Sequence, residues 1–180
     1  MDSKARAKNV ELLIFDVDGV LTGGQLFFGP DGEMLKAFHV HDGLGIAAAH
    51  KAGLKTAIIT ARESEMVRKR VAELKISDLC QGAANKLAAF DGLKEKYNLT
   101  ANQIAYVGDD LNDLPLLTRV GLACAVGNAV PEVRAAAHYV ASREGGRGGV
   151  REIIEFILKA QEKWETVVAA YTKGVKEVRQ

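Results

Sequence analysis

The chain has 180 residues, of which 48% are apolar and 26% charged, and its formal net charge is +1. This length suits one domain with a sizeable core, and the composition is that of an ordinary globular protein. A charge so close to neutral gives no electrostatic basis for binding nucleic acid or an anionic membrane. Cys80 and Cys124 form no C-x-x-C pair, so we expect both to be reduced.

The N-terminal residues are basic, but Glu11 interrupts the apolar run that a signal peptide would need. No stretch approaches the roughly 18 apolar residues of a membrane span. We therefore expect a cytoplasmic protein with neither a membrane nor a nucleic acid as its partner.

Short apolar runs predict strands, and capping residues predict the helices between them, with Asp42 as the expected N-cap of the first helix after the hairpin. In chain order the expected elements are a strand at 12–15, a hairpin of 25–28 and 34–39 around a turn at 29–32, a helix at 42–51, a strand at 55–60, a helix at 64–75, a strand at 79–81, a helix at 86–97, a strand at 104–107, a helix at 113–119, a strand at 122–125, a helix beginning at Pro131, a strand at 139–140, a loop at 145–149 and one long helix from Val150 to about Val168 or beyond.

Strands that alternate with helices predict an α/β fold with a doubly wound, Rossmann-like parallel sheet and helices on both faces. We expect a single domain over residues 1–180, with a small hairpin at about 24–40 and a C-terminal helix and tail at about 150–180. The hairpin carries Leu26, Phe27, Phe28 and Phe38. A two-stranded ribbon is marginal alone, so these side chains should pack on the parent domain or on another subunit.

Acidic residues follow two of the predicted strands. Asp16 and Asp18 come after the first strand, where Gly19 marks a turn, and the segment GDDLND places Asp109, Asp110 and Asp113 after a later one. Taken alone, Asp16 and Asp18 also suit a turn. A helix-loop-helix calcium site is the weaker alternative, because Val20 occupies the next ligand position.

Thr60 ends another strand, and Lys86 opens a helix. Ligands of open parallel sheets bind beyond the carboxyl ends of the strands, which is where these side chains should meet. Two carboxylates about 4 Å apart repel by about 4 kcal/mol at an effective dielectric constant near 20. Such a cluster needs a cation, and hard oxygen ligands suit Mg²⁺.

FDVDGVLT, the Thr of IITAR, Lys86 and GDDLND stand in the order of the four motifs of haloacid dehalogenase-like phosphatases, and the chain resembles that family from about residue 10 to residue 155. The resemblance implies that Asp16 is the nucleophile and Asp18 the acid and base. It implies that Thr60 binds the phosphoryl group and that Lys86 offsets negative charge. Mg²⁺ would be held by Asp16, the backbone carbonyl of Asp18 and Asp109, with Asp110 and Asp113 in support.

The segments between the motifs are too short for a cap domain, so the chain resembles the capless branch, with the hairpin as a flap. Capless relatives with this flap form tetramers in which subunits complete one another's sites. FHVHDGLGI, TARES and GGRGGVRE resemble segments of the 3-deoxy-D-manno-octulosonate 8-phosphate phosphatases. The implied substrate is a phosphorylated 2-keto-3-deoxy sugar acid, and the pathway is lipopolysaccharide precursor synthesis.

An arginine suits a carboxylate through paired hydrogen bonds, so Arg62 is the expected reader of the sugar acid. Two positions depart from the family pattern, because Arg is commoner at His41 and Gly at Ala61. The other candidate substrate-binding residues are Thr22, Arg70, His41 and Arg151.

Three alternatives stay open at this point. A nonulosonate 9-phosphate is the first alternative substrate, although relatives acting on nine-carbon sugars tend to place an acid where Arg62 stands. The second is a phosphatase for another small phosphate ester. The third is a non-catalytic oligomerisation module, which would predict loss of the motif residues that this chain retains.

Overall fold

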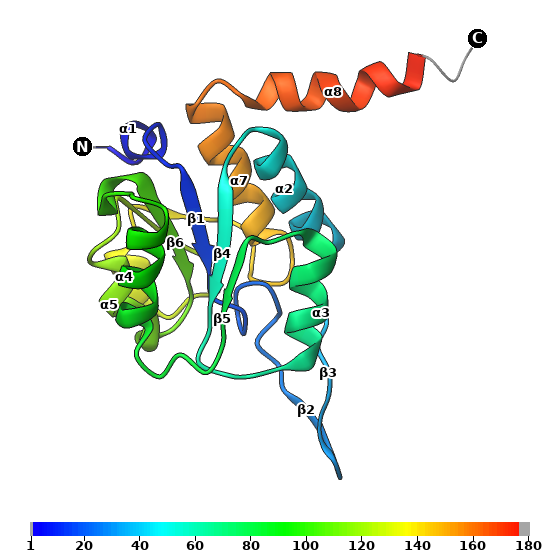
Figure 1. The fold of residues 1–180 in the computed structure, drawn as a ribbon, viewed down its shortest axis with the longest axis vertical. Helices are drawn as coiled ribbons and strands as arrows, with labels where there is room; N and C mark the ends of the chain where they lie inside the picture. Colours follow the sequence, from blue (N-terminus) through cyan, green and yellow to red (C-terminus); the bar gives the residue numbers. More distant parts are fainter. Residues whose placement is uncertain (1, 177–180) are drawn as a thin grey trace.

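A six-stranded parallel sheet forms the centre of the molecule, in a computed structural model that describes residues 2–176 (Figure 1). The strand order is β5-β4-β1-β6-β7-β8. Strand β1 (Leu12–Phe15) pairs with β4 (Lys55–Ile59) on one side and with β6 (Ile104–Gly108) on the other. The outer strands are β5 (Asp78–Cys80), β7 (Leu122–Ala125) and β8 (Tyr139–Val140). The chain therefore changes direction across the sheet at β1, where a crevice for ligands is expected.

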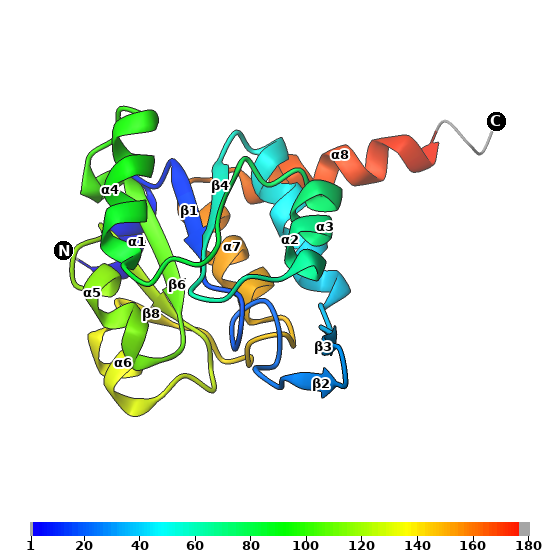
Figure 2. The same ribbon diagram turned by 60° about the horizontal axis from the view of Figure 1, so that its bottom comes forward.

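Helices cover both faces of the sheet, which confirms the predicted doubly wound fold (Figures 1 and 2). One face carries α2 (Val40–Lys51), α3 (Glu65–Leu74) and α7 (Gly149–Ala160), and the other carries α4 (Lys86–Lys96), α5 (Leu114–Leu117) and α6 (Pro131–Ala136). Helix α1 (Ser3–Ala7) packs against α7. Two 3₁₀ turns, η1 (Ala101–Gln103) and η2 (Leu111–Asp113), precede β6 and α5.

The core lies between the sheet and these helices. All four residues of β1 are completely buried, as are Ile104 and Tyr106 of β6. Strands covered on both faces read as continuous apolar runs, which is why the short runs in the sequence predicted them. Each such side chain contributes about 1.5–3 kcal/mol by leaving water.

Strands β2 (Phe27–Gly29) and β3 (Gly32–Leu35) form the predicted antiparallel flap. The flap projects from the end of the sheet to which the β1 arrow points (Figures 1 and 2). Phe38 packs against the core, whereas Phe27 and Phe28 are 43% and 59% exposed. The Phe28 ring lies 5.6 Å from the Arg62 guanidinium, so the flap contacts the parent domain but leaves much of both rings exposed.

The prediction of one long helix after Val150 is wrong. Helix α7 ends at Ala160, and α8 (Trp164–Lys176) leaves the body in a new direction (Figure 1). Glu162 adopts a left-handed conformation with φ +58°, which interrupts the helical path. The predicted tail includes residues 177–180, which lie outside the described residues. No helix between residues 2 and 176 is both long and apolar enough to span a membrane.

Asp42 also differs from its predicted role as a helix N-cap. Helix α2 begins earlier, at Val40, and His39 is its N-cap. Asp42 is buried and accepts hydrogen bonds from the amides of Gly148 at 3.3 Å and Arg151 at 2.8 Å. Its carboxylate therefore caps the N-terminus of α7. The two amide donors lie 106 and 109 residues after Asp42 in the chain.

Candidate active site

The loop after β1 carries two carboxylates at the carboxyl end of the sheet. Asp16 is the first residue beyond β1 and is 5% exposed. Its Oδ1 accepts a hydrogen bond from the Val17 amide at 2.7 Å. Asp18 follows two residues later, just before Gly19 turns the chain with φ +90°. Both acids therefore occupy the strand tip at which the sequence predicts them.

Thr22 stabilises this loop from within. Its Oγ1 accepts hydrogen bonds from the amides of Gly19 at 3.3 Å and Gly24 at 3.2 Å. Thr22 is 3% exposed. The predicted substrate-binding hydroxyl is thus occupied by the backbone of the loop, and the role it shows here is to hold that loop in shape.

Lys86 lies between two carboxylates. Asn85 caps the start of α4 and fixes the position of Lys86 in its first turn. The Lys86 Nζ donates hydrogen bonds to Asp16 Oδ2 and Asp113 Oδ1, both at 2.7 Å. Burial lowers the pKa of Lys86, but the two carboxylates outweigh that effect and raise it. The Lys86 ammonium therefore contacts the first strand-tip acid directly.

Asp113 organises the loop after β6. Its Oδ1 accepts a hydrogen bond from the Tyr106 hydroxyl at 2.5 Å, in addition to the one from Lys86. Its Oδ2 accepts hydrogen bonds from the backbone amides of Asp109 at 2.9 Å and Asp110 at 3.3 Å. The pattern GDDLND pointed to Asp113, but nothing local in the sequence pointed to Tyr106. The role of this buried tyrosine becomes evident only from the structure, in which β6 packs beside the start of α4.

Asp16, Asp109 and Asp113 form an acidic cluster in which one oxygen from each lies within 4.8 Å of the others. Burial, followed by the charges of Asp113 and Asp16, raises the pKa of Asp109 to about 7. Burial and Asp113 also raise the pKa of Asp16, although Lys86 acts in the opposite direction. Asp109 Oδ1 is buried and has no hydrogen-bond donor among the described residues. A hard divalent cation such as Mg²⁺ fits this set of oxygens.

A cavity of about 240 Å³ opens at this cluster. The residues around it come from the tips of β1, β4 and β6 and from the base of the flap, and they include Asp16, Asp18, Leu26, Thr60, Arg62, Asp109 and Asp110. Of the residues predicted for the site, Asp16, Asp18, Thr60, Arg62, Asp109 and Asp110 are therefore brought to one small space.

The comparisons with known proteins agree with this geometry. The family model for haloacid dehalogenase-like hydrolases matches residues 76–154. The Escherichia coli 3-deoxy-D-manno-octulosonate 8-phosphate phosphatase KdsC is 48% identical over 162 residues, which are 90% of this chain and 86% of that protein. The chain belongs to the haloacid dehalogenase-like hydrolases.

Solved structures of this hydrolase family superpose closely on the chain. The 3-deoxy-D-manno-octulosonate 8-phosphate phosphatase of Yersinia pestis is 44% identical, with a TM-score of 0.89, over 91% of this chain and 89% of that one. The enzyme of that name from Moraxella catarrhalis, solved with a magnesium ion, a phosphate ion and a KDO molecule, is 41% identical, with a TM-score of 0.90, over 93% of this chain and 97% of that one.

Besides Thr22, three more predicted substrate-binding residues of this hydrolase lie outside the cavity of their own chain. Arg70 stacks 5.6 Å from the Phe38 ring and bonds Glu73 at 2.9 Å. Arg151 Nε donates to Glu155 at 2.8 Å, and His41 is exposed beside His39.

Lys36 is a site residue that sequence reasoning missed. It follows β3 of the flap, and its Nζ lies 2.5 Å from Asp18 Oδ1. A single lysine beside a hairpin turn carries no motif, so the contact becomes visible only once the flap is placed against β1.

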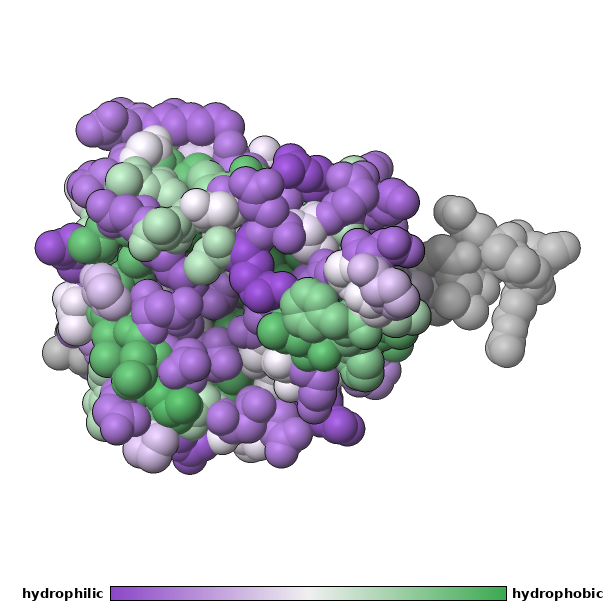
Figure 3. Space-filling view, turned by 90° about the horizontal axis from the view of Figure 1, so that it is seen from below, coloured by the Kyte–Doolittle hydropathy of each residue, from purple (hydrophilic) through white to green (hydrophobic). Residues whose placement is uncertain are grey.

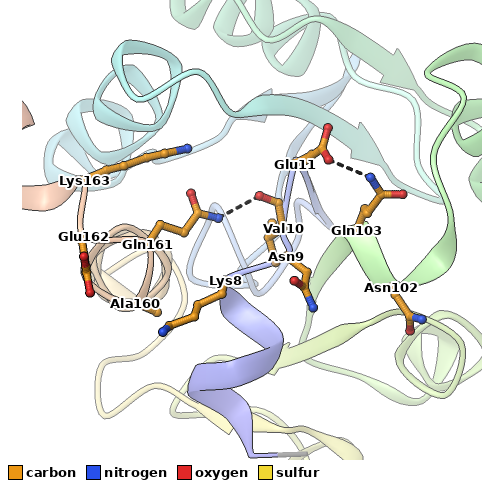
Figure 4. A pocket seen from close by; sticks show the side chains of 10 residues that line it. All are labelled: Lys8, Asn9, Val10, Glu11, Asn102, Gln103, Ala160, Gln161, Glu162 and Lys163. Atoms are coloured by element: carbon orange, nitrogen blue, oxygen red, sulfur yellow. Dashed lines mark hydrogen bonds between the residues drawn. The ribbon is translucent and has the colours of Figure 1, made fainter.

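A larger cavity of the hydrolase, about 590 Å³, lies beside the amino-terminal ends of β1 and β6, away from the acidic cluster (Figure 4). Charged and amide side chains line it, among them Lys8, Glu11, Gln103 and Gln161. Gln103 donates to Glu11 at 2.7 Å, and Gln161 donates to the Val10 carbonyl at 2.8 Å (Figure 4). None of the residues around this cavity belongs to the acidic cluster, so we place the chemistry in the smaller cavity.

Proposed function

We propose that this hydrolase is a Mg²⁺-dependent phosphatase that hydrolyses 3-deoxy-D-manno-octulosonate 8-phosphate through an aspartyl-phosphate on Asp16. The observation that carries the proposal is the buried acidic cluster, with Asp16 held by Lys86 at 2.7 Å, in a cavity lined by Thr60 and Arg62. The activity named for the relatives supports the choice of substrate.

In the first step, an Asp16 carboxylate oxygen attacks phosphorus while the bond from phosphorus to the sugar oxygen breaks. Asp18 gives its proton to that leaving oxygen. Lys86 offsets the charge on Asp16 and on the phosphoryl group, and the Thr60 hydroxyl donates a hydrogen bond to a phosphoryl oxygen. The products are the free sugar acid and the aspartyl-phosphate.

In the second step, water attacks the phosphorus of the aspartyl-phosphate. Asp18, now a carboxylate, takes a proton from that water, and the bond between phosphorus and Asp16 breaks. Inorganic phosphate leaves, Asp16 is restored as a carboxylate and Asp18 holds its proton again. One residue thus serves as acid and then as base, as covalent catalysis in two steps requires.

Asp16, Asp109 and the backbone carbonyl of Asp18 are the proposed holders of Mg²⁺. When bound, the ion neutralises negative charge on the phosphoryl oxygens. Asp113 suits a supporting role, since both of its oxygens already accept hydrogen bonds. Asp110 is likewise proposed to support the site, and its Oδ1 accepts the Leu111 amide at 2.7 Å.

Arg62 is the proposed partner of the substrate carboxylate, because it lines the cavity with its side chain 42% exposed. The alternative substrates are a nonulosonate 9-phosphate and another small phosphate ester. His41 and Ala61, which depart from the octulosonate pattern, are the observations that favour them.

We further propose a cytoplasmic homotetramer of single-domain chains, residues 1–180, in lipopolysaccharide precursor synthesis. Leu26, Phe27, Phe28, Met34 and Leu35 of the flap are 43–62% exposed, and Figure 3 shows the hydrophobic patch on this side of the molecule. A patch of this kind is typical of an interface. In such a tetramer, the flap and tail would make contacts between subunits. Arg70, His41 and Arg151 would then serve a neighbouring subunit's cavity.

The test is phosphate release with Mg²⁺ from octulosonate 8-phosphate and from a nonulosonate 9-phosphate at equal concentration. A clear preference for the first supports the proposal. Preference for the second would replace the substrate, and low rates on both would point to another phosphate ester. Absence of turnover on any ester would favour the non-catalytic module.

A further inference from the structure

The flap places a lysine against the proposed acid. Lys36 follows β3, and its side chain is 2% exposed. The Nζ atom lies 2.5 Å from Asp18 Oδ1 and 2.9 Å from Glu33 Oε1. The motifs of the family account for Lys86 but not for this second buried ammonium. A group buried with its charge needs partners, and Asp18 and Glu33 are the partners that this one has.

Further contacts anchor Lys36 to the tips of two other strands. Glu33 Oε2 accepts a hydrogen bond from the Ser64 hydroxyl, and the Ser64 amide donates to Gln81 Oε1 at 2.9 Å. Ser64 lies beyond β4, and Gln81 lies just beyond β5. A continuous row of polar contacts therefore runs from the flap across the carboxyl edge of the sheet. This row fixes the position of the Lys36 ammonium independently of the substrate.

The two oxygens of Asp18 have different neighbours. Oδ1 accepts from Lys36, whereas Oδ2 lies 3.6 Å from Arg62 Nε, beyond hydrogen-bond distance. Arg62 is partly exposed and lines the cavity together with Asp18. One oxygen of the carboxyl group is thus held, and the other remains available for proton transfer.

We propose that Lys36 is a positioning residue for Asp18, holding that carboxyl group through Oδ1 so that Oδ2 exchanges the proton. The inference rests on the function proposed above. As the bond from phosphorus to the sugar oxygen breaks, the proton moves from Asp18 Oδ2 to that oxygen. The Lys36 contact holds Oδ1 in place during this step and during the later step in which Asp18 takes a proton from water. Because Nζ is buried, Lys36 acts through Asp18 and not on the substrate.

The test compares two leaving groups. A sugar alkoxide leaves only with a proton, whereas p-nitrophenolate is stable without one. We expect Lys36→Met to lower the single-turnover rate of sugar release from octulosonate 8-phosphate about 100-fold, within the usual range for general acid catalysis. Release of p-nitrophenol from p-nitrophenyl phosphate should fall only about 3-fold, because p-nitrophenolate leaves with little proton transfer from Asp18.

Three variants bracket this result. Asp18→Asn should show the same selective loss, since it removes the acid itself. Lys36→Arg keeps the charge and should recover most of the sugar release. Lys94→Met is the matched control, because Lys94 pairs with Asp91 at 2.8 Å on the surface of α4, and both rates should stay at the wild-type value.

Equal losses on the two esters in Lys36→Met would mean that the flap merely unfolds, and unchanged rates would mean that Asp18 needs no support. Either result overturns the proposal. Should Lys36→Met fail to fold, Glu33→Gln decides, because it weakens the anchor of Lys36 and should cause a smaller loss with the same selectivity.

A wild-type enzyme that hydrolyses p-nitrophenyl phosphate but not octulosonate 8-phosphate would refute the proposed substrate alone. Lys36 would then be tested on an alkyl phosphate that the enzyme does hydrolyse. Wild-type protein that hydrolyses no ester would overturn both proposals.

Discussion

Asp16 Oδ2 and Lys86 Nζ lie 2.7 Å apart, with the two side chains 8% and 4% exposed. The residues are 70 positions apart, one after β1 and the other at the start of α4. Desolvating either charge alone is costly, so each stabilises the other in the folded protein. The pair also sets the charge at the proposed nucleophile, which links the stability of the site to its chemistry.

Asp16→Asn should abolish turnover without unfolding the protein. The amide keeps the size of the side chain but cannot form the aspartyl-phosphate, so phosphate release should fall by about 10³-fold or more. Lys86 retains Asp113 as a partner at 2.7 Å. Phosphate release with Mg²⁺ and circular dichroism check the two halves of this expectation. Substantial residual Mg²⁺-dependent activity would rule out Asp16 as the nucleophile.

Mg²⁺ should stabilise the wild-type protein, and Asp109→Asn should remove most of that effect. The cluster repels itself, and Asp109 Oδ1 is buried without a donor among the described residues. At a concentration about 100 times the dissociation constant, a ligand stabilises by about 2.7 kcal/mol. Thermal unfolding with Mg²⁺ and with a chelator measures this. Asp31→Asn, in the exposed flap turn, is the control and should keep the full shift.

Gly145→Ala should disturb the loop that carries Asp18. A Cβ atom at residue 145 would lie 1.7 Å from the Gly19 carbonyl oxygen, which is backbone and has no room to move aside. We expect a loss of about 1–3 kcal/mol in the free energy of unfolding. The rate of phosphate release should fall by roughly 10- to 100-fold, because the reacting groups are misplaced.

The matched control for that variant is Gly92→Ala on α4. Nothing lies within 4 Å of a Cβ atom there, and alanine favours a helix over glycine by about 0.5–1 kcal/mol. This variant should gain stability and keep its activity. Chemical denaturation and phosphate release measure both proteins, and equal behaviour of the two would show that the loop contact has no consequence.

His138 should make the protein less stable as the pH falls. Burial, followed by the charge of Arg6, lowers the pKa of His138 below 6.5, and its Nδ1 accepts the Ala123 amide at 2.9 Å. The folded state therefore prefers the neutral ring. Its contribution to stability is complete above about pH 6.5 and is lost as the pH falls below that value.

His138→Asn keeps a hydrogen-bond acceptor for that amide but removes the titration. The decrease in the free energy of unfolding between about pH 7 and about pH 5 should be smaller in this variant than in the wild type. Burial also lowers the pKa of His50, which is present in both proteins, so the difference between them isolates His138. Identical pH profiles would contradict the assignment.

The elements that the sequence predicted well are those whose signal is local. The strand predicted at 122–125 is β7 with the same bounds, because a short apolar run buried on both faces is its own signal. The break between α7 and α8 was not predicted, since Glu162 is an ordinary helix former that takes a left-handed conformation here. Asp42 caps α7 and not α2. A residue that caps a helix distant in the sequence stands at no characteristic position relative to that helix, so the sequence does not reveal it.

For the site, the sequence determined that acidic residues, a threonine and a lysine would follow predicted strands. The order of the four motifs along the chain indicated the family. Only the tertiary structure decided which of them meet. Because β6 pairs beside β1, Asp109 reaches Asp16. Because the chain returns from the end of β3 to the loop after β1, Lys36 reaches Asp18. The same structure placed Arg70 and Arg151 away from their own chain's cavity. Local residues determine strands and turns, whereas contacts between distant side chains depend on strand order and on how far each side chain extends.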